Sequence, residues 1–234
     1  MHQKQFILVG AGPGDPELIT LKAIKILEIA DVVLYDALVN VETLEHAKNA
    51  EKIYVGKRAG KHYASQDEIN QLIVDSLKKY NTIVRLKGGD PFIFGRAQEE
   101  IEFVQQHMPN TNIQVVPGIS SAIGIPTLHQ IPLTQRAENE SIWIVTGTKA
   151  KCALSDDIHI AAQTSATVIV LMGMNQLSNI VSIFKQHRSN DTWISIIQNG
   201  SLPEEKSVVG TLGNIEELVL ENDIKSPAVI IIRK

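Results

Sequence analysis

The sequence predicts an α/β fold of two domains, with a mainly parallel, Rossmann-like sheet in the N-terminal domain and a mixed sheet in the C-terminal domain. Apolar, β-branched runs alternate with stretches of helical periodicity up to residue 116, a pattern typical of parallel strands joined by right-handed crossovers. Beyond residue 117 strand-like runs dominate, which favours some hairpin-like pairing. The 234 residues, 44% of them hydrophobic, suffice for two cores. The predicted domains span residues 1–116 and 117–234.

The first strand is predicted at residues 6–9 and runs into the glycine-rich segment 10–15, GAGPGD. A helix over about residues 17–30 follows. Its apolar positions have helical spacing: Leu18, Leu21, Ile24 and Leu27. This unit resembles a dinucleotide site, but the third glycine comes one place early for G-x-G-x-x-G and Asp15 opposes a phosphate. A ligand that is cationic or lacks phosphate is easier to place here.

The other strands of the N-terminal domain are predicted to end at one edge of the sheet. They cover residues 31–35, 52–55, 81–84 and 112–116, with helices from the capping box of Ser65 and Glu68 and over residues 96–107. Asp36, Lys57 and the Gly88-Gly89-Asp90 turn follow the second, third and fourth strands. Ligands of parallel sheets bind outside the carboxyl ends of the strands, so we expect the active site at this edge.

Segment 85–96, RLKGGDPFIFGR, is predicted to be a ligand loop rather than a plain connection. Its adjacent glycines let the main chain turn sharply and approach a ligand closely, and Pro91 ends the strand. Two arginines, a lysine and two phenylalanines flank this turn.

The C-terminal domain is predicted to begin with a serine-capped helix near residue 120 that Pro126 interrupts, followed by a polar surface loop at 135–140. Its predicted strand-like stretches cover residues 141–145, 166–173, 193–200, 207–209 and 227–232. One clear helix carries Leu177, Ile180, Val181 and Phe184 on a single face.

Composition excludes several classes of protein. The net charge of −4 argues against nonspecific nucleic-acid binding, and no apolar run reaches membrane-spanning length. The N-terminus lacks the apolar region of a signal peptide. The single cysteine, Cys152, cannot form an internal disulfide, which fits a reducing cytoplasm. The histidines are scattered without ligand spacing, so no metal site is predicted.

Taken together, several stretches resemble the tetrapyrrole (precorrin) methylase family, and within it the branch that acts on uroporphyrinogen III. The matching stretches are VGAGPGDP at 9–16, LYDALV at 34–39, YVGKR at 54–58, segment 85–96, VPGIS at 116–120, IPLT at 131–134, Met172-Gly173, QNG at 198–200 and SPA at 226–228. They cover nearly the whole chain in the family's order. The first is shared widely among tetrapyrrole methylases, whereas the next three are particular to the uroporphyrinogen branch.

The resemblance implies a two-domain tetrapyrrole methylase fold, a homodimer, and S-adenosylmethionine bound in the cleft between the domains, with S-adenosylhomocysteine as the product. It implies methylation of uroporphyrinogen III at C2 and C7 to give precorrin-2, for siroheme synthesis, cobalamin synthesis or both. It places cofactor contacts at Pro13, Gly88, Gly89, Asp90, Ile93, Ser120, Ser121, Met172, Gly200 and Ala228. It places an acid–base pair at Asp36 and Lys57. Arg58, Arg96 and Arg136 are candidates for binding the substrate's carboxylates.

The chain departs from the family pattern at a few positions. Ala97-Gln98 replaces a Gly-Gly pair, and Gln135 and Thr148 each replace a histidine. Neither lost histidine can act as an acid, base or ligand here, so the substrate-side loop at 135–140 is the part of the resemblance that transfers least directly.

Three alternatives remain open from the sequence. A methylase of the same fold would act on a later precorrin or cobalt-precorrin. A dinucleotide oxidoreductase is weakened by the shifted glycine and Pro13. A catalytically silent tetrapyrrole-binding protein is disfavoured because Asp36 and Lys57 are both present.

Overall fold

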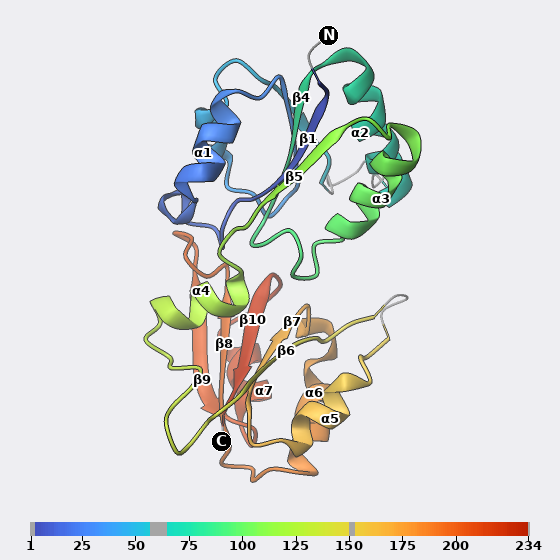
Figure 1. The fold of residues 1–234 in the computed structure, drawn as a ribbon. Coiled ribbons are helices and arrows are strands. Elements are labelled where there is room, and N and C mark those ends of the chain that lie inside the picture. The colour runs from blue at the N-terminus through green and yellow to red at the C-terminus, as the bar shows by residue number, and fades with distance from the viewer. Residues whose placement is uncertain (1–2, 57–64, 150–152, 234) are drawn as a thin grey trace. The chain divides into compact units, whose positions relative to one another are not determined.

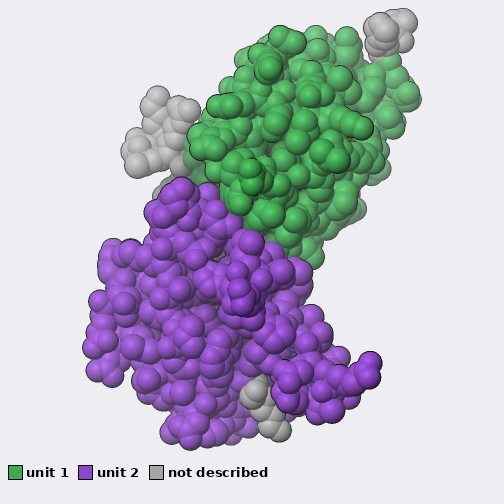
Figure 2. Space-filling model, turned by 90° about the vertical axis from the view of Figure 1, so that its left-hand side faces the viewer, with its two compact units in different colours: residues 1–120 green, residues 121–234 purple. Residues whose placement is uncertain are grey.

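The computed structural model describes residues 3–56, 65–149 and 153–233 (Figure 1). The chain forms two compact units, residues 1–120 (unit 1) and 121–234 (unit 2), which Figure 2 shows in different colours. This division falls after Ser120, whereas the sequence places it after Val116. Each unit is built on one five-stranded sheet.

The sheet of unit 1 is parallel throughout, as predicted. Its strands are Gln5–Gly10 (β1), Val32–Tyr35 (β2), Glu51–Tyr54 (β3), Thr82–Lys87 (β4) and Asn112–Val116 (β5). They lie in the order β3-β2-β4-β1-β5, with every neighbouring pair parallel. All the carboxyl ends of the strands therefore meet at one edge of the sheet.

Helices cover both faces of this sheet (Figure 1). They are the 3₁₀ helices Pro16–Leu18 (η1) and Val41–His46 (η2), and the α-helices Leu21–Glu28 (α1), Gln66–Lys79 (α2) and Ala97–His107 (α3). One core cluster joins α1 and η2 to side chains such as Ile7 and Val9. A second cluster joins α2 and α3 to the opposite-facing Phe6 and Leu8. Because successive strand residues point to opposite faces, β1 is buried on both.

The first helix begins later than predicted. Asp15 caps the short η1, and α1 starts only at Leu21, where the Thr20 hydroxyl accepts a bond from the Ala23 N–H at 3.1 Å. Leu21, one of the apolar residues at helical spacing, is 77% exposed. The capping box of Ser65 and Glu68 at the start of α2 is confirmed.

Unit 2 contains the predicted mixed sheet. Its strands are Ile142–Thr146 (β6), Thr167–Leu171 (β7), Trp193–Gln198 (β8), Lys206–Thr211 (β9) and Ala228–Ile232 (β10). The order is β6-β7-β10-β8-β9, and only β6 and β7 pair in parallel. The consecutive strands β8 and β9 pair antiparallel and form the hairpin-like component that the sequence indicated.

Helices again cover the sheet of unit 2. They are Ser121–Leu128 (α4), Asp157–Gln163 (α5), Met174–Gln176 (η4), Leu177–Lys185 (α6) and Ile215–Glu221 (α7). The core on one face includes residues of α5, α6 and α7, and the core on the other face includes Ala122 and Ile125 of α4. Pro126 does not interrupt α4 as predicted, since the helix continues to Leu128. Burial of one face stabilises a short helix more than propensity does.

None of the helices in the described ranges is long and apolar enough to span a lipid bilayer.

Candidate active site

The turns that follow β1, β4 and β5 pack against one another directly through main-chain atoms. A Cβ atom on Gly10 would lie 2.5 Å from the Gly118 nitrogen and 2.6 Å from the Gly89 oxygen. A Cβ atom on Gly118 would lie 2.3 Å from the same Gly89 oxygen. Gly89 also exchanges hydrogen bonds with Gly12, at 2.7 and 3.3 Å, and both glycines have positive φ. Only glycine fits these positions, because the turns are in direct contact with one another.

Side chains near these turns fasten the loops together. One carboxylate oxygen of Asp90 accepts a bond from the Phe92 N–H at 2.9 Å, and the other accepts one from the Gly118 N–H at 3.1 Å. A Cβ atom on Gly88 would lie 2.5 Å from the Cβ atom of Leu38. The packing of the turn after β4 against the turn after β2 therefore requires glycine at position 88, independently of any ligand.

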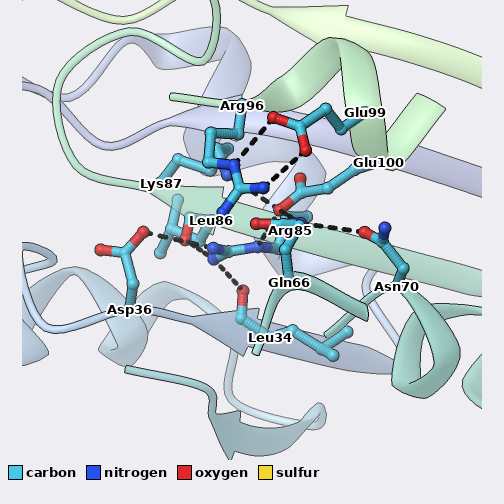
Figure 3. Close-up of polar contacts among 10 residues, drawn as sticks. All are labelled: Leu34, Asp36, Gln66, Asn70, Arg85, Leu86, Lys87, Arg96, Glu99 and Glu100. Atoms are coloured by element: carbon cyan, nitrogen blue, oxygen red, sulfur yellow. Dashed lines mark hydrogen bonds and ion pairs between the residues drawn. The ribbon is translucent and has the colours of Figure 1, made fainter. Parts of the chain in front are cut away.

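Asp36 lies at the carboxyl end of β2 and is held from two sides. Its Oδ1 accepts a bond from the Leu38 N–H at 3.1 Å, and its Oδ2 lies 3.4 Å from Nη2 of Arg85 on β4. The Arg85 side chain is buried, and its Nη1 donates to the carbonyls of Leu34 and Leu86 at 3.4 and 2.9 Å. Figure 3 shows the guanidinium lying between Asp36 and the carboxylate of Glu100. Asp36 is therefore a fixed carboxylate at the sheet edge.

A buried charge cluster lies behind Asp36. Arg85 is 3% exposed, Lys87 is 4% exposed and Glu100 of α3 is fully buried. The Glu100 Oε1 lies 3.1 Å from Arg85 Nε and 3.0 Å from Lys87 Nζ. Burial lowers the pKa of Lys87, and repulsion from Arg85 lowers it further against the opposing attraction of Glu100. The sequence placed Arg85 and Lys87 around a ligand loop, whereas the structure turns both inward.

The sequence interpretation missed Glu100. On α3 it shares the buried face with Ala97 and Val104, positions at the spacing that defines one side of a helix. A carboxylate on this apolar face was the available signal. Its pairing with two cations could not be read from spacing, because the helix and β4 are brought together only by the fold.

The predicted substrate-binding arginines differ in their surroundings. Arg96 is solvent-exposed and forms a two-pronged pair with Glu99, at 2.8 and 2.6 Å. This hydrogen-bonded pairing raises the pKa of Arg96 and lowers the pKa of Glu99. Arg136 is exposed in a loop whose residues 135–140 are all exposed except the buried Asn139. Arg58, like the predicted acid–base partner Lys57, lies outside the described residues.

In unit 2 the predicted cofactor residues gather at one edge of the sheet. The register pairs Leu171 with Val229 and Gln198 with Ala228, so Met172, Gly200 and Ala228 adjoin the same edge. Met172 is 53% exposed with a positive φ, and its carbonyl accepts a bond from the Thr148 hydroxyl at 2.8 Å. A Cβ atom on Gly200 would lie 2.7 Å from the side chain of Ile125 on α4.

The remaining predicted cofactor residues lie in turns after strands or at the start of a helix. Pro13 lies in the turn after β1, Ile93 is an exposed apolar residue of the turn after β4, and Ser120 and Ser121 adjoin the start of α4. Within each unit the predicted residues thus lie at the sheet edge or beside it. No cluster of histidine, cysteine or acidic side chains suited to a metal ion is found among the residues that the structure describes.

The glycine-rich segment is not arranged for a pyrophosphate. Such sites use free N–H groups at a helix start, but the Asp15 carboxylate already accepts a bond from the Glu17 N–H at 2.8 Å. The following α1 is capped by Thr20 and begins several residues later. The dinucleotide alternative is therefore disfavoured by the geometry as well as by the sequence. The glycine main chain at the ends of the strands, here called the glycine floor, suits a ligand that does not need free N–H groups for a phosphate.

Comparison with known proteins fits this arrangement. The family model for tetrapyrrole (corrin/porphyrin) methylases matches residues 5–216. The chain belongs to the tetrapyrrole methylase family. A uroporphyrinogen-III C-methyltransferase from Methanocaldococcus jannaschii is 44% identical over 229 residues, 97% of this chain and 94% of the relative. A siroheme synthase from Pseudoalteromonas atlantica is 45% identical, over 96% of this chain but 49% of its own length.

Solved structures agree. A crystal structure of uroporphyrin-III C-methyl transferase from Thermus thermophilus complexed with S-adenosyl homocysteine has a TM-score of 0.84 and 35% identity to this methylase. The match covers 98% of this chain and 97% of the other. The family resemblance and the two-unit α/β fold predicted from sequence are thus confirmed.

Proposed function

We propose that this methylase transfers methyl groups from S-adenosylmethionine to C2 and C7 of uroporphyrinogen III and so makes precorrin-2 for siroheme synthesis, cobalamin synthesis or both. The observation that carries the proposal is the 44% identity, over 97% of the chain, to a relative named for this activity. The glycine floor and the fixed carboxylate at one sheet edge support it. Methyl transfer is a displacement that needs positioning more than a covalent nucleophile.

The proposed cofactor contacts are Pro13, Gly88, Gly89, Asp90, Ile93, Ser120, Ser121, Met172, Gly200 and Ala228. The relative complexed with S-adenosyl homocysteine supports this group as ligand. The exposed side chains of Ile93 and Met172 offer apolar surface that a bound ligand would cover. When bound, the cofactor supplies the electrophilic methyl group.

Asp36 and Lys57 are proposed to move protons during the reaction. Methylation of a pyrrole carbon leaves a cationic ring that must lose a proton, and product formation moves a proton elsewhere on the macrocycle. A carboxylate accepts a proton and an ammonium donates one. Asp36 is suited to this role because its position is fixed and a quarter of its side chain reaches solvent. Arg58, Arg96 and Arg136 are proposed to receive the substrate's carboxylates.

The deciding experiment is methyl transfer from labelled S-adenosylmethionine to uroporphyrinogen III, with the product identified by mass and absorption. We expect two methyl groups per substrate molecule. Transfer of a different number, or methylation of later precorrins only, would favour the alternative methylase. Calorimetry with S-adenosylhomocysteine and with NAD separates the oxidoreductase alternative, for which NAD should bind and the nucleoside thioether should not.

Replacing Arg136 tests the substrate-binding proposal. Because Arg136 is exposed, Arg136→Ala should raise the KM for uroporphyrinogen III several-fold at low salt and leave S-adenosylhomocysteine affinity unchanged. The effect should shrink at high salt, since screening weakens exposed charge contacts over about 10 Å at 0.1 M ionic strength. Lys78→Ala, which removes another exposed cation from α2, is the control and should not alter KM. A salt-independent loss with Arg136→Ala would indicate a structural role instead.

We also propose that the methylase is a homodimer in the cytoplasm. The dimer follows from the family resemblance, and the reducing compartment from the single cysteine of the sequence. Sedimentation equilibrium tests the first, since the chain mass of 25.8 kDa should double.

A further inference from the structure

Glu100 has an unusual position for a carboxylate in a parallel α/β unit. It is fully buried on α3, and its Oε1 meets three donors: Arg85 Nε at 3.1 Å, Lys87 Nζ at 3.0 Å and Gln66 Nε2 at 3.4 Å. Its Oε2 has no hydrogen-bond partner among the described residues. Burying an ion pair rarely adds net stability over an apolar pair of the same shape. The burial of Glu100 with its two cations therefore points to a role other than stability.

Arg85 connects Glu100 to the active-site edge. Its guanidinium is a rigid planar fork, so a bond at one nitrogen fixes the direction of the others. Arg85 Nε lies 3.1 Å from Glu100 Oε1, and Nη2 of the same planar group lies 3.4 Å from Asp36 Oδ2. The Nη1 bonds to two main-chain carbonyls fix the plane. Figure 3 shows the resulting row of Glu100, Arg85 and Asp36.

The charges alternate along the row from Asp36 through Arg85 to Glu100. Among the described residues, Asp36 faces the cations Arg85 and Lys87 on β4, and Glu100 lies behind them on α3. The Tyr54 hydroxyl lies beside the same turn, since both it and the Ala37 nitrogen would be 2.6 Å from a Cβ on Gly56. Without Glu100, two buried cations would face one carboxylate and Arg85 would lose the anchor that aims it. Asp36 would then be drawn inward and away from solvent.

We propose that Glu100 is a positioning residue that acts through Arg85 to hold the Asp36 carboxylate at the sheet edge where the substrate must be deprotonated. This inference rests on the proposed function, in which Asp36 accepts a proton. Glu100 itself does not touch the substrate, because it is fully buried. Lys87 is a second cation beside Glu100, with its Nζ 3.0 Å from the same Oε1, and helps to hold the Glu100 side chain in place.

The test is a double-mutant cycle between Glu100→Gln and Asp36→Asn. Glutamine keeps the shape of Glu100 and removes its charge, and a displaced reacting group costs up to about 10²-fold in rate. We expect E100Q to lower kcat about 10- to 100-fold, with KM and S-adenosylhomocysteine affinity unchanged. In the D36N background E100Q should lower kcat no further, because effects through one group are not additive. Glu102→Gln, on the exposed side of α3, is the matched control and should behave as wild type.

Further variants keep the inference falsifiable. If E100Q does not fold, E100Q combined with Lys87→Met removes one buried cation with the anion, and the same loss of kcat is expected. Unchanged kcat, losses that add in the double variant, or a joint loss of cofactor binding would each overturn the inference. A crystal structure of E100Q is independent of the reaction: an unmoved Asp36 carboxylate would refute Glu100 as positioner, whereas absence of methyl transfer by the wild type would refute the proposed function instead.

Discussion

Asp36→Asn is expected to lower kcat by about 10²–10⁴-fold, the usual contribution of a positioned proton acceptor. Asparagine preserves the oxygen that accepts the Leu38 N–H bond, and it removes the charge, the basic site and the acceptor oxygen that faces Arg85 Nη2. The KM for uroporphyrinogen III and the affinity for S-adenosylhomocysteine should stay near wild type. Steady-state kinetics and calorimetry on the same preparation measure both quantities, and a loss confined to kcat is the signature of an interaction made in the transition state.

The control is the carboxylate at the opposite end of the same strand. Asp31 precedes β2 and accepts bonds from the Asn81 and Thr82 N–H groups at 2.9 and 2.8 Å. Asp31→Asn retains an oxygen for these bonds, so it should turn over like wild type. If the Asp36 variant also turned over at near wild-type rate with saturating substrate, Asp36 would not be the base.

Gly118→Ala is expected to destabilise unit 1 by about 3 kcal/mol, at the upper end of overpacking costs. The new methyl group would meet the Gly89 oxygen at 2.3 Å and the Gly10 Cα at 2.7 Å. These are main-chain atoms of two other turns, so no flexible side chain can move aside. S-adenosylhomocysteine binding should weaken as well, because the three turns form the proposed cofactor floor.

Urea unfolding followed by two probes localises the effect. Both tryptophans lie in unit 2, at Trp143 and Trp193, whereas all four tyrosines lie in unit 1. The urea concentration at the midpoint of unfolding should fall when the tyrosine signal is followed. It should not change when the tryptophan signal is followed. Gly213→Ala is the control, since its Cβ would come no closer than 3.4 Å to any atom. Equal midpoints for Gly118→Ala and wild type would show that the turns can separate at little cost.

Features that depend on a local pattern of residues could be predicted from the sequence. The β-branched runs indicated the strands, the Ser65–Glu68 pair marked the start of α2, and the helix containing Ile180 and Phe184 was read from its spacing. Such features follow from side-chain periodicity and capping, which act within a few residues. The convergence of Asp36 and the Gly88–Gly89 turn at one edge also followed, because parallel strands end together.

Which side chains face inward could not be predicted in the same way, because it depends on how distant elements pack together. Leu21 matches the helical pattern yet is exposed, and α4 runs on through Pro126. Arg85 and Lys87 were interpreted as charges of a ligand loop. In the structure both are buried, and both pair with Glu100 of the following helix. Burying a charge is unfavourable unless a partner compensates it. Whether a charged residue lies in the core is therefore set by a partner from another element, which the local sequence around it does not reveal.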